Sequence, residues 1–162
     1  MPQQLKSWRQ KAFKSMAIIS GKWQARFIHL AKEIASWSKD SGTQVGAVIV
    51  RPDRTICSVG FNGFPRGVED SQSAIANRDT KLLRTIHAEL NAILSAKESL
   101  VGYSLFVWPF QPCSACAAAI IQAGIIDVYC PFNDHLANER WSESFKAALQ
   151  MFDEAEVRVI YS

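Results

Sequence analysis

The sequence has few cysteines, no long hydrophobic run and no internal repeat. Four cysteines in 162 residues, with no secretory leader, do not make the dense pattern of a disulfide scaffold. The longest apolar stretches are far shorter than the ~20 residues that a helix needs to cross a bilayer. The chain also lacks low-complexity segments and is long enough to bury one core. These absences favour a single soluble domain in a reducing compartment, and we expect a cytoplasmic protein without a membrane partner.

Acidic residues are missing from the start of the chain, where the first one is Glu33. Residues 1–26 carry a charge of +6, whereas the remaining residues carry −3. The same stretch holds three aromatic residues, Trp8, Phe13 and Trp23. Such an arm can attract nucleic acid or anionic lipid, or act as a targeting segment. The favoured interpretation is a helix docked on its own domain or on a second subunit. We therefore divide the chain into a basic arm, 1–22, and one domain, 23–162.

Hydrophobic periodicity predicts alternating helices and strands. Apolar residues at three- and four-residue spacing predict helices over 23–40, 86–99, 113–123 and 138–152. Apolar runs bounded by turn residues predict strands over 45–50, 55–61, 104–108, 128–130 and 157–161. The helix over 86–99 is expected to bury three residues, Leu90, Ile93 and Leu94. The pattern indicates an α/β fold with a sheet of about five strands and helices on both faces.

Two short motifs carry the chemistry: His87-Ala88-Glu89 and Pro112-Cys113-Ser114-Ala115-Cys116. Zinc takes four tetrahedral N or S ligands in structural sites, and three plus an open position in catalytic sites. His87, Cys113 and Cys116 supply three, which leaves one position for a water that zinc activates near neutral pH. Glu89 is placed to move protons and is not a ligand. The spacing matches the H-x-E…P-C-x-x-C pattern of zinc nucleobase deaminases.

A Cys-x-x-Cys pair also occurs in redox sites and as half of a structural zinc site. A redox pair does not call for a His-x-Glu partner, and a structural site needs a fourth ligand. The remaining cysteines, Cys57 and Cys130, lie in apolar runs, where free cysteine behaves as a small buried hydrophobe. The catalytic interpretation is therefore the favoured one.

Both motifs are expected at the starts of helices. Pro112 is a common first helical residue, and Cys113 and Cys116 are three apart, on one helical face. Helix N-termini present unpaired N–H groups and a partial positive charge, which stabilise thiolates and anionic oxygen. Two such N-termini, converging on one metal, would build a rigid site from residues distant in sequence.

These residues resemble the cytidine and deoxycytidylate deaminase superfamily, and most closely its dCMP deaminases. Four blocks carry the resemblance beyond the zinc motif: Thr43–Val50, Gly60–Gly67, Ile86–Leu94 and Ile120–Ile125. It covers roughly residues 25–130. The resemblance implies a three-layer α/β/α sandwich that binds Zn²⁺ and hydrolyses dCMP to dUMP and ammonia.

The resemblance also implies roles for individual residues. Glu89 would carry a proton from water to ring N3 and then to the departing amine. The backbone carbonyl of Ala88 would hold the exocyclic amine, and Asn62 would hydrogen-bond the sugar or the base edge. An Asn-Gly pair after a strand is also an ordinary turn. We favour the binding role for Asn62 because the surrounding block matches as well.

A 5′-phosphate needs cationic or N–H donors. The cations near the matching blocks are Lys39, Arg66, Arg78, Lys81 and Arg84. We predict Arg66 and Lys39 as the phosphate ligands, although such residues are more often solvated surface charges.

Two segments depart from the family pattern. The approach to the cysteine pair, Trp108–Cys113, is one residue longer than usual, which predicts Trp108 at the pocket rim. The segment Pro131–His135 lacks the tyrosine that dCMP deaminases place near the phosphate, and His135 is a possible substitute. These differences leave open another amino-bearing substrate: a nucleoside, a purine base or a modified pyrimidine.

Two other functions compete with a nucleotide deaminase. A polynucleotide deaminase needs a basic, aromatic-lined channel, whereas the body of this chain is net negative, so a nucleic-acid partner is not expected. A non-catalytic zinc module has no use for Glu89. Apolar surface around Cys116–Gly124 and in the arm predicts a homo-oligomer, a hexamer or a dimer. Regulation by dCTP and dTTP is known in the family, and the Gly60–Gly67 loop is a candidate site for it.

Overall fold

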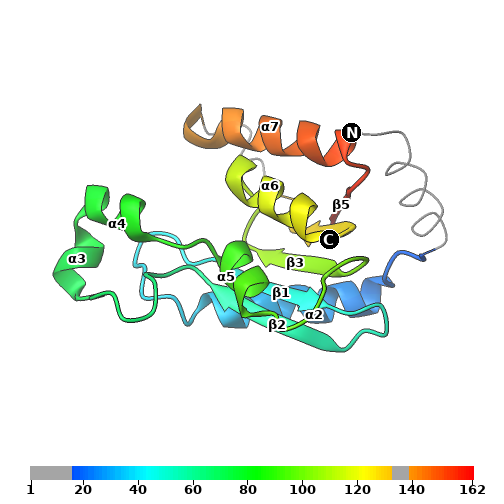
Figure 1. Cartoon of the computed structure of the whole chain (residues 1–162), viewed down its shortest axis with the longest axis horizontal. Helices are drawn as coiled ribbons and strands as arrows, with labels where there is room; N and C mark the ends of the chain where they lie inside the picture. Colours follow the sequence, from blue (N-terminus) through cyan, green and yellow to red (C-terminus); the bar gives the residue numbers. More distant parts are fainter. Residues whose placement is uncertain (1–15, 133–138) are drawn as a thin grey trace.

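A computed structural model describes residues 16–132 and 139–162, so His135 and residues 1–15 of the predicted arm lie outside the described residues. One five-stranded sheet in the order β2-β1-β3-β4-β5 forms its middle layer (Figure 1). The strands are β1 (Gly46–Val50), β2 (Ile56–Phe61), β3 (Ser104–Trp108), β4 (Asp127–Cys130) and β5 (Arg158–Tyr161). β1 pairs antiparallel with β2 and β3, whereas β3, β4 and β5 run parallel. The predicted five-stranded α/β sheet is confirmed.

Six helices are described: α2 (Gly21–Ala35), α3 (Gln72–Ala76), α4 (Arg78–Arg84), α5 (Ala88–Ser95), α6 (Ser114–Ala123) and α7 (Glu139–Glu154). Four of them match the predicted helices. Helix α2 ends earlier than predicted because the serines after it bond to the backbone: Ser36 Oγ donates to Glu33 O, and Ser38 Oγ donates to Asn62 O. Helices α3 and α4 bury no residue and were not predicted. Among the described helices, none combines the length and apolarity that a membrane span requires.

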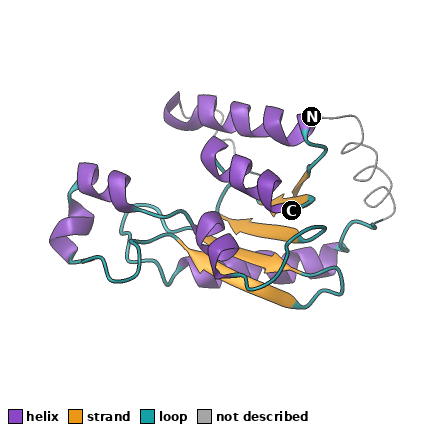
Figure 2. Cartoon of the chain, viewed as in Figure 1, coloured by secondary structure: helices purple, strands orange, loops and turns teal. Residues whose placement is uncertain are grey.

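The helices form a layer on each side of the sheet (Figure 2). Val48, Val50, Phe106 and Tyr129 point to one face and pack against α2. The alternate residues of the same strands pack with α5, α6 and α7 on the other face: Ala47, Ile49, Leu105, Val107 and Val128. The predicted three-layer α/β/α sandwich is therefore confirmed.

Two glycines set how closely helices approach the sheet. A Cβ at Gly46 in β1 would collide with the backbone of α2 at Ala31 and Ala35. A Cβ at Gly60 in β2 would collide with the backbone of α5 at Ala88 and Ala92. The second contact explains why the predicted burial of Leu94 is wrong. Small residues of α5 face the sheet, and the Leu94 side chain is 61% exposed.

Candidate active site

Two helix N-termini bring the predicted metal ligands together. His87 is the N-cap residue of α5, Cys113 is the N-cap residue of α6, and Cys116 lies in the first turn of α6. His87 Nδ1 is 3.5 Å from Cys113 Sγ and 3.4 Å from Cys116 Sγ. A tetrahedral zinc with ordinary Zn–N and Zn–S bonds places such atoms about 3.5 Å apart. The three donor atoms lie within 4.8 Å of one another, so this ligand set fits zinc.

Hydrogen bonds connect the three ligand side chains. The hydrogen bond between the two sulfurs lowers the pKa of Cys113 and raises the pKa of Cys116. The hydrogen bond to Cys113 raises the pKa of His87. Zinc binds thiolates and neutral imidazole, so its binding at this site releases protons.

Glu89 stands beside the ligand set without belonging to it. Its side chain, in the first turn of α5, is only 4% exposed, and it lines the same cavity as His87 and Cys113. Burial raises the pKa of the Glu89 carboxyl group. Among the described residues the metal-ligand cluster contains only His87, Cys113 and Cys116. A buried carboxyl group beside a metal-ligand cluster, and outside it, can move protons without binding the metal.

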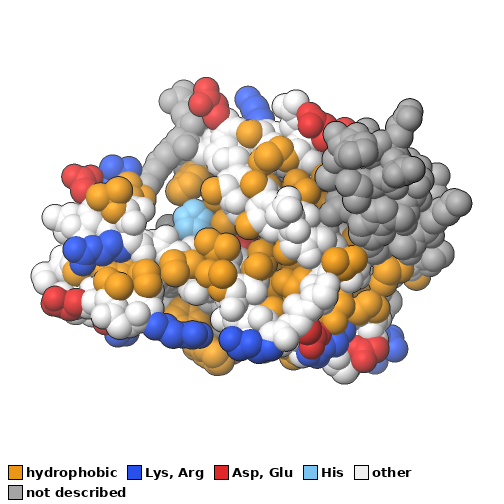
Figure 3. Space-filling model, in the orientation of Figure 1, with side chains coloured by type: hydrophobic (Ala, Val, Ile, Leu, Met, Phe, Trp, Pro, Cys, Tyr) orange, Lys and Arg blue, Asp and Glu red, His pale blue; other side chains and the backbone are white. Residues whose placement is uncertain are grey.

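The cavity at the metal ligands measures about 120 Å³. The face that carries it is hollowed between the α3–α4 lobe and the helices α6 and α7, and hydrophobic side chains gather near α5 (Figure 3). One wall of the cavity is aromatic. The ring centroid of Phe145 lies 5.9 Å from that of Phe110 and 6.1 Å from that of Trp141. The sequence reasoning missed this wall. Its only signal was an aromatic pair four residues apart, Trp141 and Phe145, which is equally typical of ordinary core packing.

Asn62 lines the cavity, and its side chain hydrogen-bonds the backbone of the segment before β1. Its Oδ1 accepts from the Val45 N–H at 2.8 Å, and its Nδ2 donates to Thr43 O at 2.8 Å. These contacts fix the orientation of the amide. One N–H and one lone pair of the side chain remain for a ligand.

Ala88 is fully buried and lines the cavity. Its carbonyl belongs to the first turn of α5, where carbonyls point toward the C-terminal end of the helix. The Ala88 carbonyl oxygen also lies against Gly60 of β2. The N–H of Ala88, at the first position of the helix, has no intrahelical acceptor. The structure therefore turns the amide N–H of Ala88, rather than its carbonyl, toward the open end of α5.

The structure does not bring Lys39, Arg66 and Trp108 to the metal ligands. Lys39 and Arg66 line a second cavity of about 400 Å³, and Lys39 pairs with Asp70 at 2.7 Å. Trp108 points to the α2 face, where the Lys32 ammonium lies 5.1 Å from its ring centroid. Trp108 takes this side because β3 alternates, so residue 108 shares the face of Phe106.

A buried carboxyl group beside three side chains that fit zinc, on an α/β sandwich, is the arrangement expected of a metal-dependent hydrolase. A model of the cytidine and deoxycytidylate deaminase zinc-binding region matches residues 21–131. The chain belongs to this zinc-binding deaminase family, whose members are hydrolases that act on C–N bonds.

Several known proteins are similar to the chain. It is 49% identical over 140 residues to an uncharacterized deaminase from the luxG 3′ region of Aliivibrio fischeri, covering 86% of this chain and 93% of that protein. It is 42% identical over 112 residues to human deoxycytidylate deaminase, covering 65% of this chain and 62% of the human protein. The chain thus spans less than two thirds of the human relative.

A solved structure shares the fold. The apo dCMP deaminase from cyanophage S-TIM5 superposes with a TM-score of 0.70 at 23% identity, over 89% of this chain and 100% of that chain. The same phage enzyme has been solved in complex with dCMP and dUMP, with a TM-score of 0.69 at 24% identity, over 90% and 100% of the two chains. At this identity the likeness shows the fold.

Proposed function

We propose that the protein is a dCMP deaminase, which hydrolyses dCMP to dUMP and ammonia. The observation that carries this proposal is the buried Glu89 beside the converging ligands His87, Cys113 and Cys116. Relatives named deoxycytidylate deaminase, including the human and mouse proteins, support the substrate.

The residues of the site have separate roles in metal binding and substrate binding. His87, Cys113 and Cys116 would hold zinc, which when bound lowers the pKa of a water so that it attacks near neutral pH. Asn62 offers its remaining N–H and lone pair to the sugar or the base edge. The aromatic wall of Phe110, Trp141 and Phe145 excludes solvent and gives the pyrimidine ring an apolar contact.

Glu89 carries protons in both halves of the reaction. It accepts a proton from the attacking water and donates it to ring N3 while the oxygen adds to C4. It then accepts the remaining hydroxyl proton and donates it to the amino group, which leaves as ammonia. One carboxyl group suffices because each transfer restores the protonation state that the next one needs.

The test is an ultraviolet assay of zinc-loaded protein with dCMP, deoxycytidine and dCTP as separate substrates. We expect dCMP to be the best substrate and Glu89→Gln to lower kcat by about 10²- to 10⁴-fold. Glu33→Gln, on the exposed side of α2, is the matched control and should retain activity. Failure of zinc-replete wild-type protein to deaminate any of the three compounds would refute the proposed function.

A further inference from the structure

We propose that Lys81 of α4 recognises the 5′-phosphate of the substrate and so makes the enzyme prefer a nucleotide to a nucleoside. This inference rests on the proposed function. It replaces Lys39 and Arg66, which the sequence had favoured for this role.

Lys81 lines the cavity at the metal ligands. Among the described residues it is the only Lys or Arg that lines the cavity containing His87, Cys113 and Glu89. Each of the two lysines pairs with one carboxylate, Lys81 with Asp40 and Lys39 with Asp70, but the Lys81 side chain is 24% exposed and that of Lys39 is 64% exposed. A partly buried charge is less screened by water and salt, so it contributes more to anion binding than an exposed one does.

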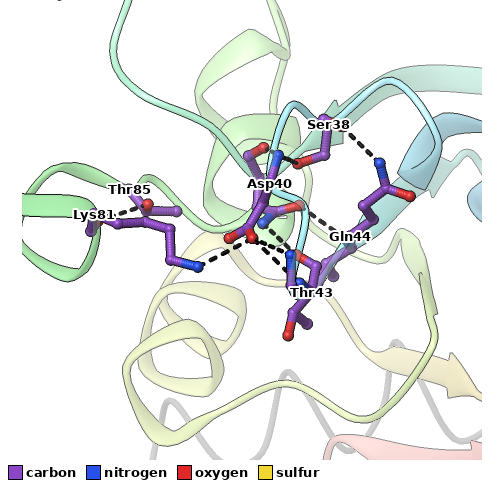
Figure 4. A network of polar contacts seen from close by, with 9 residues as sticks. Ser38, Asp40, Thr43, Gln44, Lys81 and Thr85 are labelled. Carbon is purple, nitrogen blue, oxygen red and sulfur yellow. Dashed lines mark hydrogen bonds and ion pairs between the residues drawn. The ribbon is translucent and has the colours of Figure 1, made fainter. Parts of the chain in front are cut away.

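Asp40 holds Lys81 in place without using its full donor capacity. The Lys81 Nζ donates to Asp40 Oδ1 at 3.1 Å (Figure 4). The same carboxylate oxygen accepts the backbone N–H groups of Gly42 at 2.8 Å and Thr43 at 3.2 Å. Burial opposes ionisation of Asp40, but these three donors outweigh it and lower its pKa. An ammonium has three N–H donors, and within the described part of the chain only Asp40 accepts from Lys81, so two donors remain for an anion.

The sizes of the two cavities place the phosphate at Lys81. Ligand sites commonly measure about 300–1,000 Å³. The cavity at the metal ligands measures about 120 Å³, so it has room for a group of the size of a ring but not for a whole nucleotide. The rest of a nucleotide must extend past the rim. Four residues line both this cavity and the larger one beside it: Asp40, Asn62, Lys81 and Thr85. Lys81 is the cation in that shared wall, where the 5′ end of the substrate crosses.

The experiment compares kcat/KM for dCMP and for deoxycytidine in wild type, Lys81→Met and Lys81→Gln. We expect the ratio of dCMP to deoxycytidine to fall about 10- to 100-fold in both variants, with deoxycytidine turnover retained. Loss of a merely structural contact would lower kcat/KM for both substrates together and leave their ratio unchanged. Where wild type does not turn over deoxycytidine, the readout is the KM for dCMP, which should rise at least about tenfold at nearly constant kcat.

Two further variants complete the design. Lys97→Met, an exposed lysine away from both cavities, is the control and should keep the wild-type ratio. Lys39→Met tests the rival residue. An unchanged ratio, or unchanged KM, in a folded Lys81 variant overturns the inference, as does a loss of dCMP preference in Lys39→Met alone. Absence of turnover in wild type would instead refute the proposed function.

Discussion

The two faces of the sheet use their side chains differently. On the α2 face, aromatic rings pack in a continuous series: the ring centroids of Phe27 and Phe106 lie 5.0 Å apart in a tilted pair, and those of Phe106 and Tyr129 lie 4.4 Å apart in a stacked pair. On the opposite face, small residues such as Ala88 and Ala92 let α5 lie close to the strands, and Glu89 is buried beside them. On the α2 side the contacts are apolar and serve the fold. The opposite side carries the larger apolar cluster, with Ile49, Leu105 and Phe145 among its buried residues, and it also brings two helix N-termini to one cluster of metal ligands.

The largest effect should come from removing a metal ligand on the chemical face. Cys113→Ser replaces a thiolate with a hydroxyl, a weak zinc ligand, so we expect loss of bound zinc and deamination at background level. A chelator should lower the Tm of wild type but not that of Cys113→Ser, because zinc stabilises only a chain that binds it. Cys57→Ser, outside the ligand cluster, is the matched control and should keep zinc and activity. Full zinc content in Cys113→Ser would show that the ligand set is different.

The two close-approach glycines allow a direct comparison of the faces. Gly46→Ala and Gly60→Ala each push a Cβ into helix backbone, and overpacking of this kind costs about 1–3 kcal/mol of unfolding free energy. We expect Gly46→Ala to lower Tm at unchanged kcat. Gly60→Ala should lower both Tm and kcat, because the added Cβ displaces α5 and with it Glu89. Gly21→Ala, where an added Cβ meets nothing within 4 Å, is the control. Equal kcat in the Gly46 and Gly60 variants would contradict the separation of roles.

A smaller effect should appear on the aromatic face. The Tyr129 hydroxyl accepts the Ile19 N–H at 3.1 Å, so Tyr129→Phe should cost about 1 kcal/mol at neutral pH. Burial raises the pKa of Tyr129, so its stabilising effect is complete below pH ~10 and is lost as pH rises through the raised pKa. The unfolding free energies of wild type and Tyr129→Phe, measured by urea titration, should therefore converge above that pH. If the two unfolding free energies differ by a constant amount up to the highest pH at which the protein folds, ionisation of Tyr129 does not affect stability.

The sequence was sufficient to predict that His87, Cys113 and Cys116 cluster, because each of the two motifs that supply them is local. His87 and Glu89 lie in one turn of helix, and so do Cys113 and Cys116, so the chemistry is visible without the fold. The strands were visible as apolar runs. The three-layer arrangement then followed from alternation of strands with helices.

Other features depend on tertiary contacts and left little signal. A strand covered on both faces is apolar throughout, so the run 104–108 did not show on which side Trp108 lies. Helices α3 and α4 bury nothing and therefore have no apolar periodicity. The choice of Lys81 over Lys39 needs the wall between two cavities. The homo-oligomer, the cytoplasmic location and the basic arm stay predictions.

We expect the metal ligands and the proton carrier to be separate parts of one site. The direct measurement is the zinc content and the rate of dCMP deamination of the same preparations of wild type and Glu89→Gln. We predict one zinc per chain in both proteins, with deamination only in wild type. Deamination at the wild-type rate by Glu89→Gln would show that Glu89 is not the proton carrier, and loss of its zinc would show that Glu89 is needed to hold the metal.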